Sequence, residues 1–102
     1  MNKYGVFDEK GNEISTTITL HPGEVLDMEL ATRGIKKNFF AAQLNIKPNQ
    51  LSELLHQKRH ISATMALKLE ALLGINAEYW MRVQSAYDLA KARELMKQRV
   101  AA

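Results

Sequence analysis

The chain has 102 residues, which suffices for one domain with a single modest core and is too short for two ordinary domains. Cysteine is absent, which excludes disulfides, thiolate metal sites and cysteine nucleophiles and suits a reducing compartment. The net charge is +3, and residues 33–59 hold six bases and one acid, an imbalance expected of a surface that contacts phosphates. No apolar run approaches the roughly 20 residues of a membrane span, and no signal peptide is evident, so a cytoplasmic protein without membrane contact is expected.

Residues 1–20 differ from the rest of the chain because they are rich in residues that favour strands. These residues are Tyr4, Val6, Phe7, Ile14, Thr16, Thr17, Ile18 and Thr19. Gly11 lies between the two groups and suits the left-handed position of a turn. A short N-terminal β-hairpin is predicted here. Because two strands alone are marginally stable, a flexible arm is the alternative.

After residue 20, apolar residues recur at helical spacing and predict five helices. Pro22 fits the first position of a helix that Gly34 ends, and Asn45 can adopt the left-handed conformation that ends the second. Ser62 and Asn76 are of the residue types that cap the fourth and fifth helices. The predicted helices are residues 22–33, 36–44, 48–57, 63–73 and 77–97. The predicted organisation is a hairpin or arm (1–20), a helical domain (21–97) and a tail (98–102).

The second and third predicted helices are short and follow each other closely, which is the outline of a helix-turn-helix. Ala41 suits the point where two helices cross, because only a small side chain fits there. Ile46 and Leu51 are expected to fix the angle of the third helix, and its leucines Leu54 and Leu55 are expected in the core.

Five pieces of sequence, in register over residues 21 to about 92, resemble the HigA-type antitoxins of the lambda-repressor-like (XRE) helix-turn-helix family. The pieces are HPGE at 21–24, PNQLSELL at 48–55, KR with IS at 58–62, ALKL with LG at 66–74, and EYW with QSAYDL at 78–89. The chain departs from the family pattern at Asn45, where Gly is usual, and at His56-Gln57, where Asn-Gly is usual.

The resemblance implies a mostly α, five-helix lambda-repressor-like domain whose third helix enters the DNA major groove. It also implies repression of the protein's own operon and neutralisation of a RelE-like toxin that cleaves mRNA. One module contacts few base pairs, so a homodimer on a palindromic operator is expected. No cofactor is implied. The alternatives are a solitary XRE-type regulator without a toxin and a domain that binds only a toxin.

Base contacts are expected from the polar side of the third helix, because Asn and Gln can pair bidentately with adenine and Glu can accept from cytosine. The expected residues are Lys47, Asn49, Gln50, Ser52 and Glu53. Phosphates would repel Glu53, so pairing with Lys47 or Arg59 is its alternative role. Phosphate contacts are expected from Lys36, Lys37, Lys58 and Arg59, which would add salt dependence without sequence preference.

An enzyme is the rival class, and the sequence offers little for one. His56 and His60 have a spacing that metal ligands use on a helix, but the predicted helix ends between them and no third ligand is near. No metal site or catalytic residue is therefore predicted, and no phosphate loop is present. Trp80 on the fifth helix is expected in the core rather than in a dimer contact. Phe39 is either a buried neighbour of Phe40 or a contact for another protein.

Overall fold

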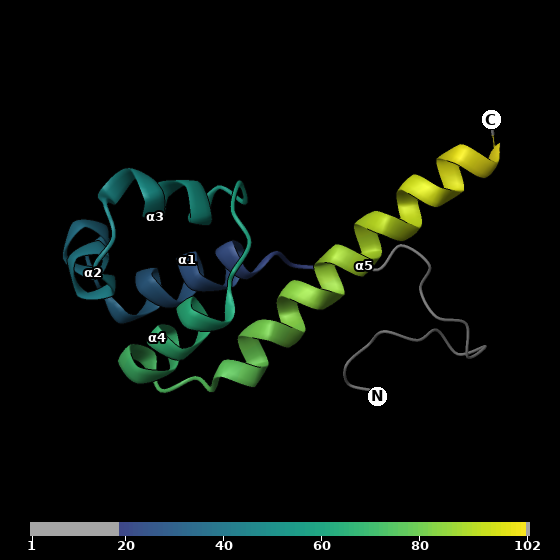
Figure 1. Cartoon of the computed structure of the whole chain (residues 1–102). Coiled ribbons are helices and arrows are strands. Elements are labelled where there is room, and N and C mark those ends of the chain that lie inside the picture. Colours follow the sequence, from purple (N-terminus) through teal and green to yellow (C-terminus); the bar gives the residue numbers. More distant parts are fainter. Residues whose placement is uncertain (1–18, 102) are drawn as a thin grey trace.

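The computed structural model describes residues 19–101, which form five α-helices (Figure 1). The helices are α1 (Pro22–Arg33), α2 (Lys37–Leu44), α3 (Pro48–Leu55), α4 (Ala63–Leu73) and α5 (Ala77–Ala101). No strand occurs in this range, so the prediction of a mostly helical, five-helix domain is confirmed. The predicted hairpin at 1–20 lies outside the described residues, except for residues 19 and 20, which are irregular.

The helix ends follow the capping residues of the sequence closely. Asn45 ends α2 with φ at 62°, in the left-handed conformation expected of it. The Ser62 hydroxyl accepts from the Met65 amide at 3.1 Å and caps α4. The predicted end of the third helix was two residues too late, because Gln57 adopts a left-handed φ of 66° and the helix stops at Leu55. The fifth helix continues to Ala101, beyond the predicted Lys97.

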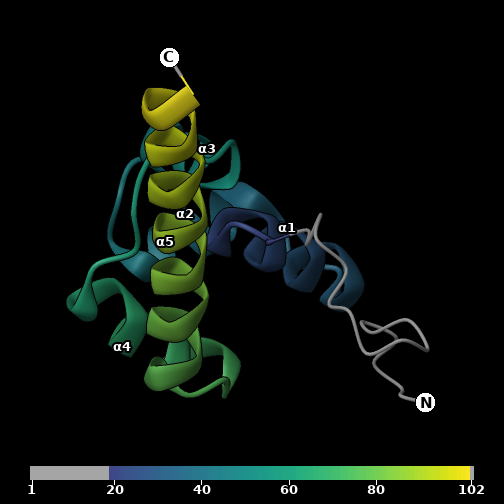
Figure 2. The same ribbon diagram turned by 90° about the vertical axis from the view of Figure 1, so that its right-hand side faces the viewer.

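The core lies where α1 to α4 meet the first half of α5. Phe40 and Trp80 are its largest side chains, and Trp80 is fully buried, as the sequence predicted. Ala41 is also fully buried, which fits its predicted place at a close helix crossing. The second half of α5 extends away from the other helices (Figures 1 and 2). None of the described helices combines the length and apolar character that crossing a bilayer requires.

His21 caps the first helix and joins it to the last. Its Nδ1 atom accepts from the Gly23 amide at 2.8 Å, while Glu24 Oε1 accepts from the His21 amide at 3.0 Å. The imidazole also meets the Tyr87 ring edge-on, with the ring centres 4.7 Å apart. Burial, and then the nearby His60, lower the pKa of His21 below its ordinary value. The neutral ring that results is the form in which Nδ1 can accept a hydrogen bond.

Gly23 lets the start of α1 approach the backbone of α3. A Cβ atom at this position would overlap the carbonyl oxygen of Leu54. Because that oxygen belongs to a helix backbone, it cannot turn aside as a flexible side chain can. The HPGE piece therefore combines a cap at His21 with a close approach at Gly23, and together they place α1 against α3.

Replacing Gly23 with alanine should lower the free energy of unfolding by about 3 kcal/mol, because α1 must move away from α3 to relieve the overlap. The matched control is Gly74→Ala at the end of α4, where an added Cβ meets nothing within 4 Å and only the φ of 77° opposes it. That control should cost about 1 kcal/mol. Urea unfolding of the two variants measures the difference, and equal losses would contradict the close approach at Gly23.

Candidate DNA interface

The link between α2 and α3 is a tight three-residue turn that fixes the angle of α3. The left-handed Asn45 donates its amide to Ala42 O, and the Ile46 amide donates to Ala41 O, each at 3.0 Å. The Lys68 ammonium of α4 donates to the carbonyl of Leu44 at 2.9 Å, so the end of α2 is tied to α4. The turn is therefore held by its own backbone hydrogen bonds and by the contact from Lys68.

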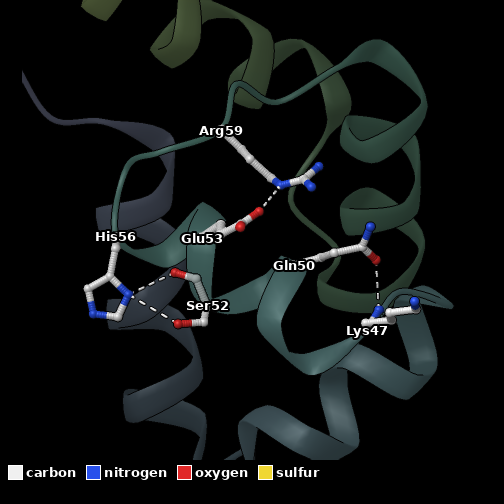
Figure 3. A network of polar contacts seen from close by, with 6 residues as sticks. All are labelled: Lys47, Gln50, Ser52, Glu53, His56 and Arg59. Carbon is white, nitrogen blue, oxygen red and sulfur yellow. Dashed lines mark hydrogen bonds and ion pairs between the residues drawn. The ribbon is translucent and has the colours of Figure 1, made fainter.

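Burial on one face of α3 determines which residues the other face presents. Leu51, Leu54 and Leu55 are buried, as predicted. Among the five predicted base-contacting residues, Lys47, Asn49 and Ser52 are exposed, while Gln50 and Glu53 are half-buried. All five belong to α3 or to the residue just before it, and Figure 3 shows four of them on this segment.

Three polar contacts along α3 engage side chains of the predicted set (Figure 3). Gln50 Oε1 accepts from the Lys47 amide at 2.8 Å and so caps the helix. Glu53 pairs with Arg59, its Oε1 lying 2.6 Å from Arg59 Nε, so of the two partners considered for it the structure selects Arg59. His56 Nδ1 lies 2.8 Å from the Ser52 carbonyl oxygen and 3.3 Å from its hydroxyl. The role of His56 was not predicted, although its spacing of four from Ser52 is a usable signal.

The four predicted phosphate-contacting residues are exposed and come from two places in the fold. Lys36 and Lys37 stand at the start of α2, whose first amides have no side-chain cap. Backbone amides at such a helix start attract anions. Lys37 Nζ lies 3.6 Å from Asp27 Oδ1, and both side chains are at least half exposed, so this ion pair can exchange with solvent. Lys58 and Arg59 lie in the loop that follows α3.

Gln84 of α5 holds the loop that carries Lys58 and Arg59. The Gln84 side chain is buried, and its Oε1 accepts from the Ile61 amide at 2.6 Å. Its Nε2 donates to Asp88 Oδ1 at 3.0 Å and lies 3.2 Å from His60 Nδ1. Removing the Gln84 side-chain amide would leave the buried Ile61 N–H without a hydrogen-bond partner, which lowers the free energy of unfolding. The sequence placed Gln84 in a family motif but did not reveal this contact, which joins residues 23 apart.

His56 and His60, whose spacing is one that metal ligands use, both take part in local polar contacts. His56 ends α3, and His60 faces Gln84 and Asp88. Within residues 19–101, no three side chains of the metal-binding types gather as a metal site requires.

Comparison with known proteins defines the class of this chain. Residues 29–80 match the family described as Helix-turn-helix, and the chain belongs to that family. Virulence-associated protein I of Dichelobacter nodosus is 36% identical over 76 residues, which cover 74% of this chain and 70% of that protein.

Two solved structures show which kind of helix-turn-helix protein the chain resembles. An addiction module antidote protein of the HigA family from Coxiella burnetii superposes with a TM-score of 0.74 at 31% identity, over 83% of this chain and 94% of its own. The Pseudomonas aeruginosa antitoxin HigA, solved with the higBA promoter, superposes with a TM-score of 0.74 at 31% identity, over 81% of this chain and 91% of its own. The resemblance to HigA-type antitoxins that the sequence indicated is confirmed.

Replacing Gln84 with leucine should weaken DNA binding about fivefold, because ordering the released loop costs roughly 1 kcal/mol when DNA binds. Gln98→Leu makes the same change at an exposed position of α5 and serves as the control. Fluorescence anisotropy with DNA from upstream of the gene measures affinity, and hydrogen exchange at the Ile61 amide measures release of the loop. A folded Gln84 variant with faster exchange at Ile61 and unchanged affinity would contradict the positioning role.

Proposed function

We propose that the protein is a sequence-specific transcriptional repressor that binds a palindromic operator as a homodimer and regulates its own operon. The observation that carries the proposal is the polar face of α3, where Asn49 and Ser52 are exposed because the opposite face is held in the core. A short helix anchored in this way and presenting polar side chains fits the DNA major groove. The likeness to a HigA solved with its promoter supports the same conclusion.

The polar contacts on α3 suggest separate roles for the proposed base-contacting residues. Asn49 and Lys47 are exposed and can reach base edges, whereas the Ser52 hydroxyl must first leave His56 Nδ1, which lies 3.3 Å away. Gln50 keeps its amide N–H groups as donors while its oxygen caps the helix. Glu53 is engaged by Arg59, so a contact from Glu53 to cytosine requires this ion pair to open. Both side chains are nearly half exposed, and such pairs are worth roughly 0–1 kcal/mol, so opening costs little.

The dimer follows from how little DNA one module can read. A single α3 reaches only a few base pairs, and two copies related by a two-fold axis read two half-sites about 34 Å apart. The phosphate contacts that we assign to Lys36, Lys37, Lys58 and Arg59 would flank each half-site and supply affinity independent of sequence.

Replacing Asn49 with alanine should lower operator affinity by about tenfold or more while leaving random DNA almost unaffected, because one base contact contributes about 1–3 kcal/mol of discrimination. Lys37→Ala, the comparison variant, should weaken both DNAs about equally and reduce the salt slope by about 1. Gel-shift titrations at several salt concentrations measure both effects. Equal losses on operator and random DNA for the Asn49 variant would show that Asn49 does not read a base.

We further propose that the protein is an antitoxin that neutralises a RelE-like toxin, an enzyme that cleaves mRNA. The likeness to an antidote protein of the HigA family supports this role. Phe39 of α2 is a candidate contact, because the residue is 58% exposed and is therefore not the buried neighbour of Phe40. A solitary regulator without a toxin is the alternative function.

Expression of a short, basic reading frame beside this gene should arrest bacterial growth, and co-expression of this chain should restore it. The Asn49→Ala variant should restore growth as well as the unchanged chain does, because neutralising a toxin does not require base contacts. Growth curves and mRNA integrity measure the outcome. If the neighbouring product arrests growth whether or not this chain is present, or if no such reading frame exists, the solitary regulator is favoured.

A further inference from the structure

The exposed side of α3 continues past the proposed base-contacting residues and ends at His56. Asn49, Ser52 and His56 follow one another at spacings of three and four, which places them on one side of the helix. All three are exposed. The proposed DNA contacts leave the imidazole of His56 unused, although an exposed imidazole can form hydrogen bonds through both of its ring nitrogens.

The contact with Ser52 determines which ring nitrogen of His56 carries a hydrogen. Nδ1 lies 2.8 Å from the Ser52 carbonyl oxygen, which can only accept a hydrogen bond, so Nδ1 is the donor. Nε2 of the neutral ring then has a lone pair, and it gains a hydrogen only when the ring is protonated. Nε2 points away from Ser52 and has no hydrogen-bond partner within residues 19–101 (Figure 3). Protonation therefore converts the free side of the ring from an acceptor into a cationic donor.

The position of His56 along α3 places it near the edge of a DNA groove. A helix rises about 1.5 Å per residue, so His56 lies about 10 Å beyond Asn49. The major groove is about 12 Å wide, and in a helix-turn-helix the first residues of the recognition helix contact the bases. If Asn49 reads a base, His56 therefore lies near the phosphates that border the groove. A phosphate offers acceptors, so Nε2 can donate to it only from the protonated ring.

The charged groups on the elements that adjoin this end of α3 leave His56 without a carboxylate partner. No ion pair within the described residues includes His56. The neighbouring groups are held in other contacts: Glu53 pairs with Arg59, Glu24 of α1 accepts from the His21 amide, and His60 and Asp88 of α5 contact Gln84. Lys58 follows in the loop and is exposed. A protonated His56 therefore adds a positive charge that a phosphate can use.

We propose that His56 is a further DNA-contacting residue that binds a phosphate through Nε2 in its protonated form, so that DNA binding takes up one proton per copy of the chain. The inference rests on the DNA binding of the proposed function and adds a contact to it. His56 also stands at a position where the chain departs from the family pattern, which usually has Asn there. An asparagine amide does not titrate, so the proton linkage belongs to this chain rather than to the fold.

Binding of upstream DNA and of random DNA at about pH 6 and about pH 8 tests the proposal, because histidine changes charge in this range. At the lower pH the affinity of the unchanged chain should be about fivefold higher for both DNAs, since a phosphate contact has no sequence preference. The salt slope should also increase by about 1 per bound copy. His56→Asn should show neither effect. His56→Arg carries a permanent charge and should keep the higher affinity at both pH values.

His60→Gln is the matched control, because His60 is also exposed and lies beside Arg59. This variant should keep the full pH effect. His21 is buried, and its protonation would remove the cap of α1, which thermal unfolding at both pH values detects. Calorimetry in buffers of different ionisation enthalpy counts the protons taken up on binding. The count should fall by up to about one per copy in His56→Asn, since one imidazole is lost.

The outcomes separate the contact from DNA binding itself. If the pH effect persists in His56→Asn, or disappears in His60→Gln, another group takes up the proton and the proposal is overturned. If the unchanged chain binds DNA equally well at both pH values, DNA binding stands and the contact from His56 is wrong. If the chain binds no DNA at either pH, the proposed function fails as well. A rise in affinity confined to the upstream DNA would overturn the phosphate contact, because it would show that His56 reads a base.

Discussion

The attachment of α3 to the core is the contact on which the rest of the structure depends. An eight-residue helix is too short to be stable alone in water, so its stability comes from packing. Leu51, Leu54 and Leu55 are almost fully buried, and each contributes about 2 kcal/mol on burial. Gly23 adds a close approach of α1 to the α3 backbone. Because three leucines occupy one side of so short a helix, its polar residues are left on the other.

Some polar contacts around α3 hold the backbone in place, and others can break and be replaced by contacts with solvent. Gln84 is buried and holds the Ile61 amide, so its loss leaves a buried donor without a partner. The side chains of the Glu53–Arg59 pair are nearly half exposed, so the pair contributes little to stability. The loop after α3 is therefore fixed through α5, while the side chains of Lys58 and Arg59 stay exposed. In the DNA binding that we propose, α5 would therefore have an indirect role, through the loop that Gln84 holds.

The helix-turn-helix fold alone does not decide which partners a protein has, because function resides in sites placed on the fold. In this chain the candidate site is the polar face of α3, where Asn49 and Ser52 are exposed while the opposite face is buried. The function that we propose depends on the side chains of this face rather than on the fold alone.

The sequence by itself determined the helices, because apolar periodicity and capping residues depend on neighbours three or four positions away. It predicted the left-handed Asn45 and the cap at Ser62 for this reason, and it predicted the buried Trp80 because large aromatic side chains dominate cores. Only the tertiary structure decided that Glu53 pairs with Arg59 rather than Lys47, and that Gln84 reaches Ile61 across 23 residues. Such contacts depend on how whole helices pack, and no local pattern of residues specifies which distant backbone amide a buried side chain will meet.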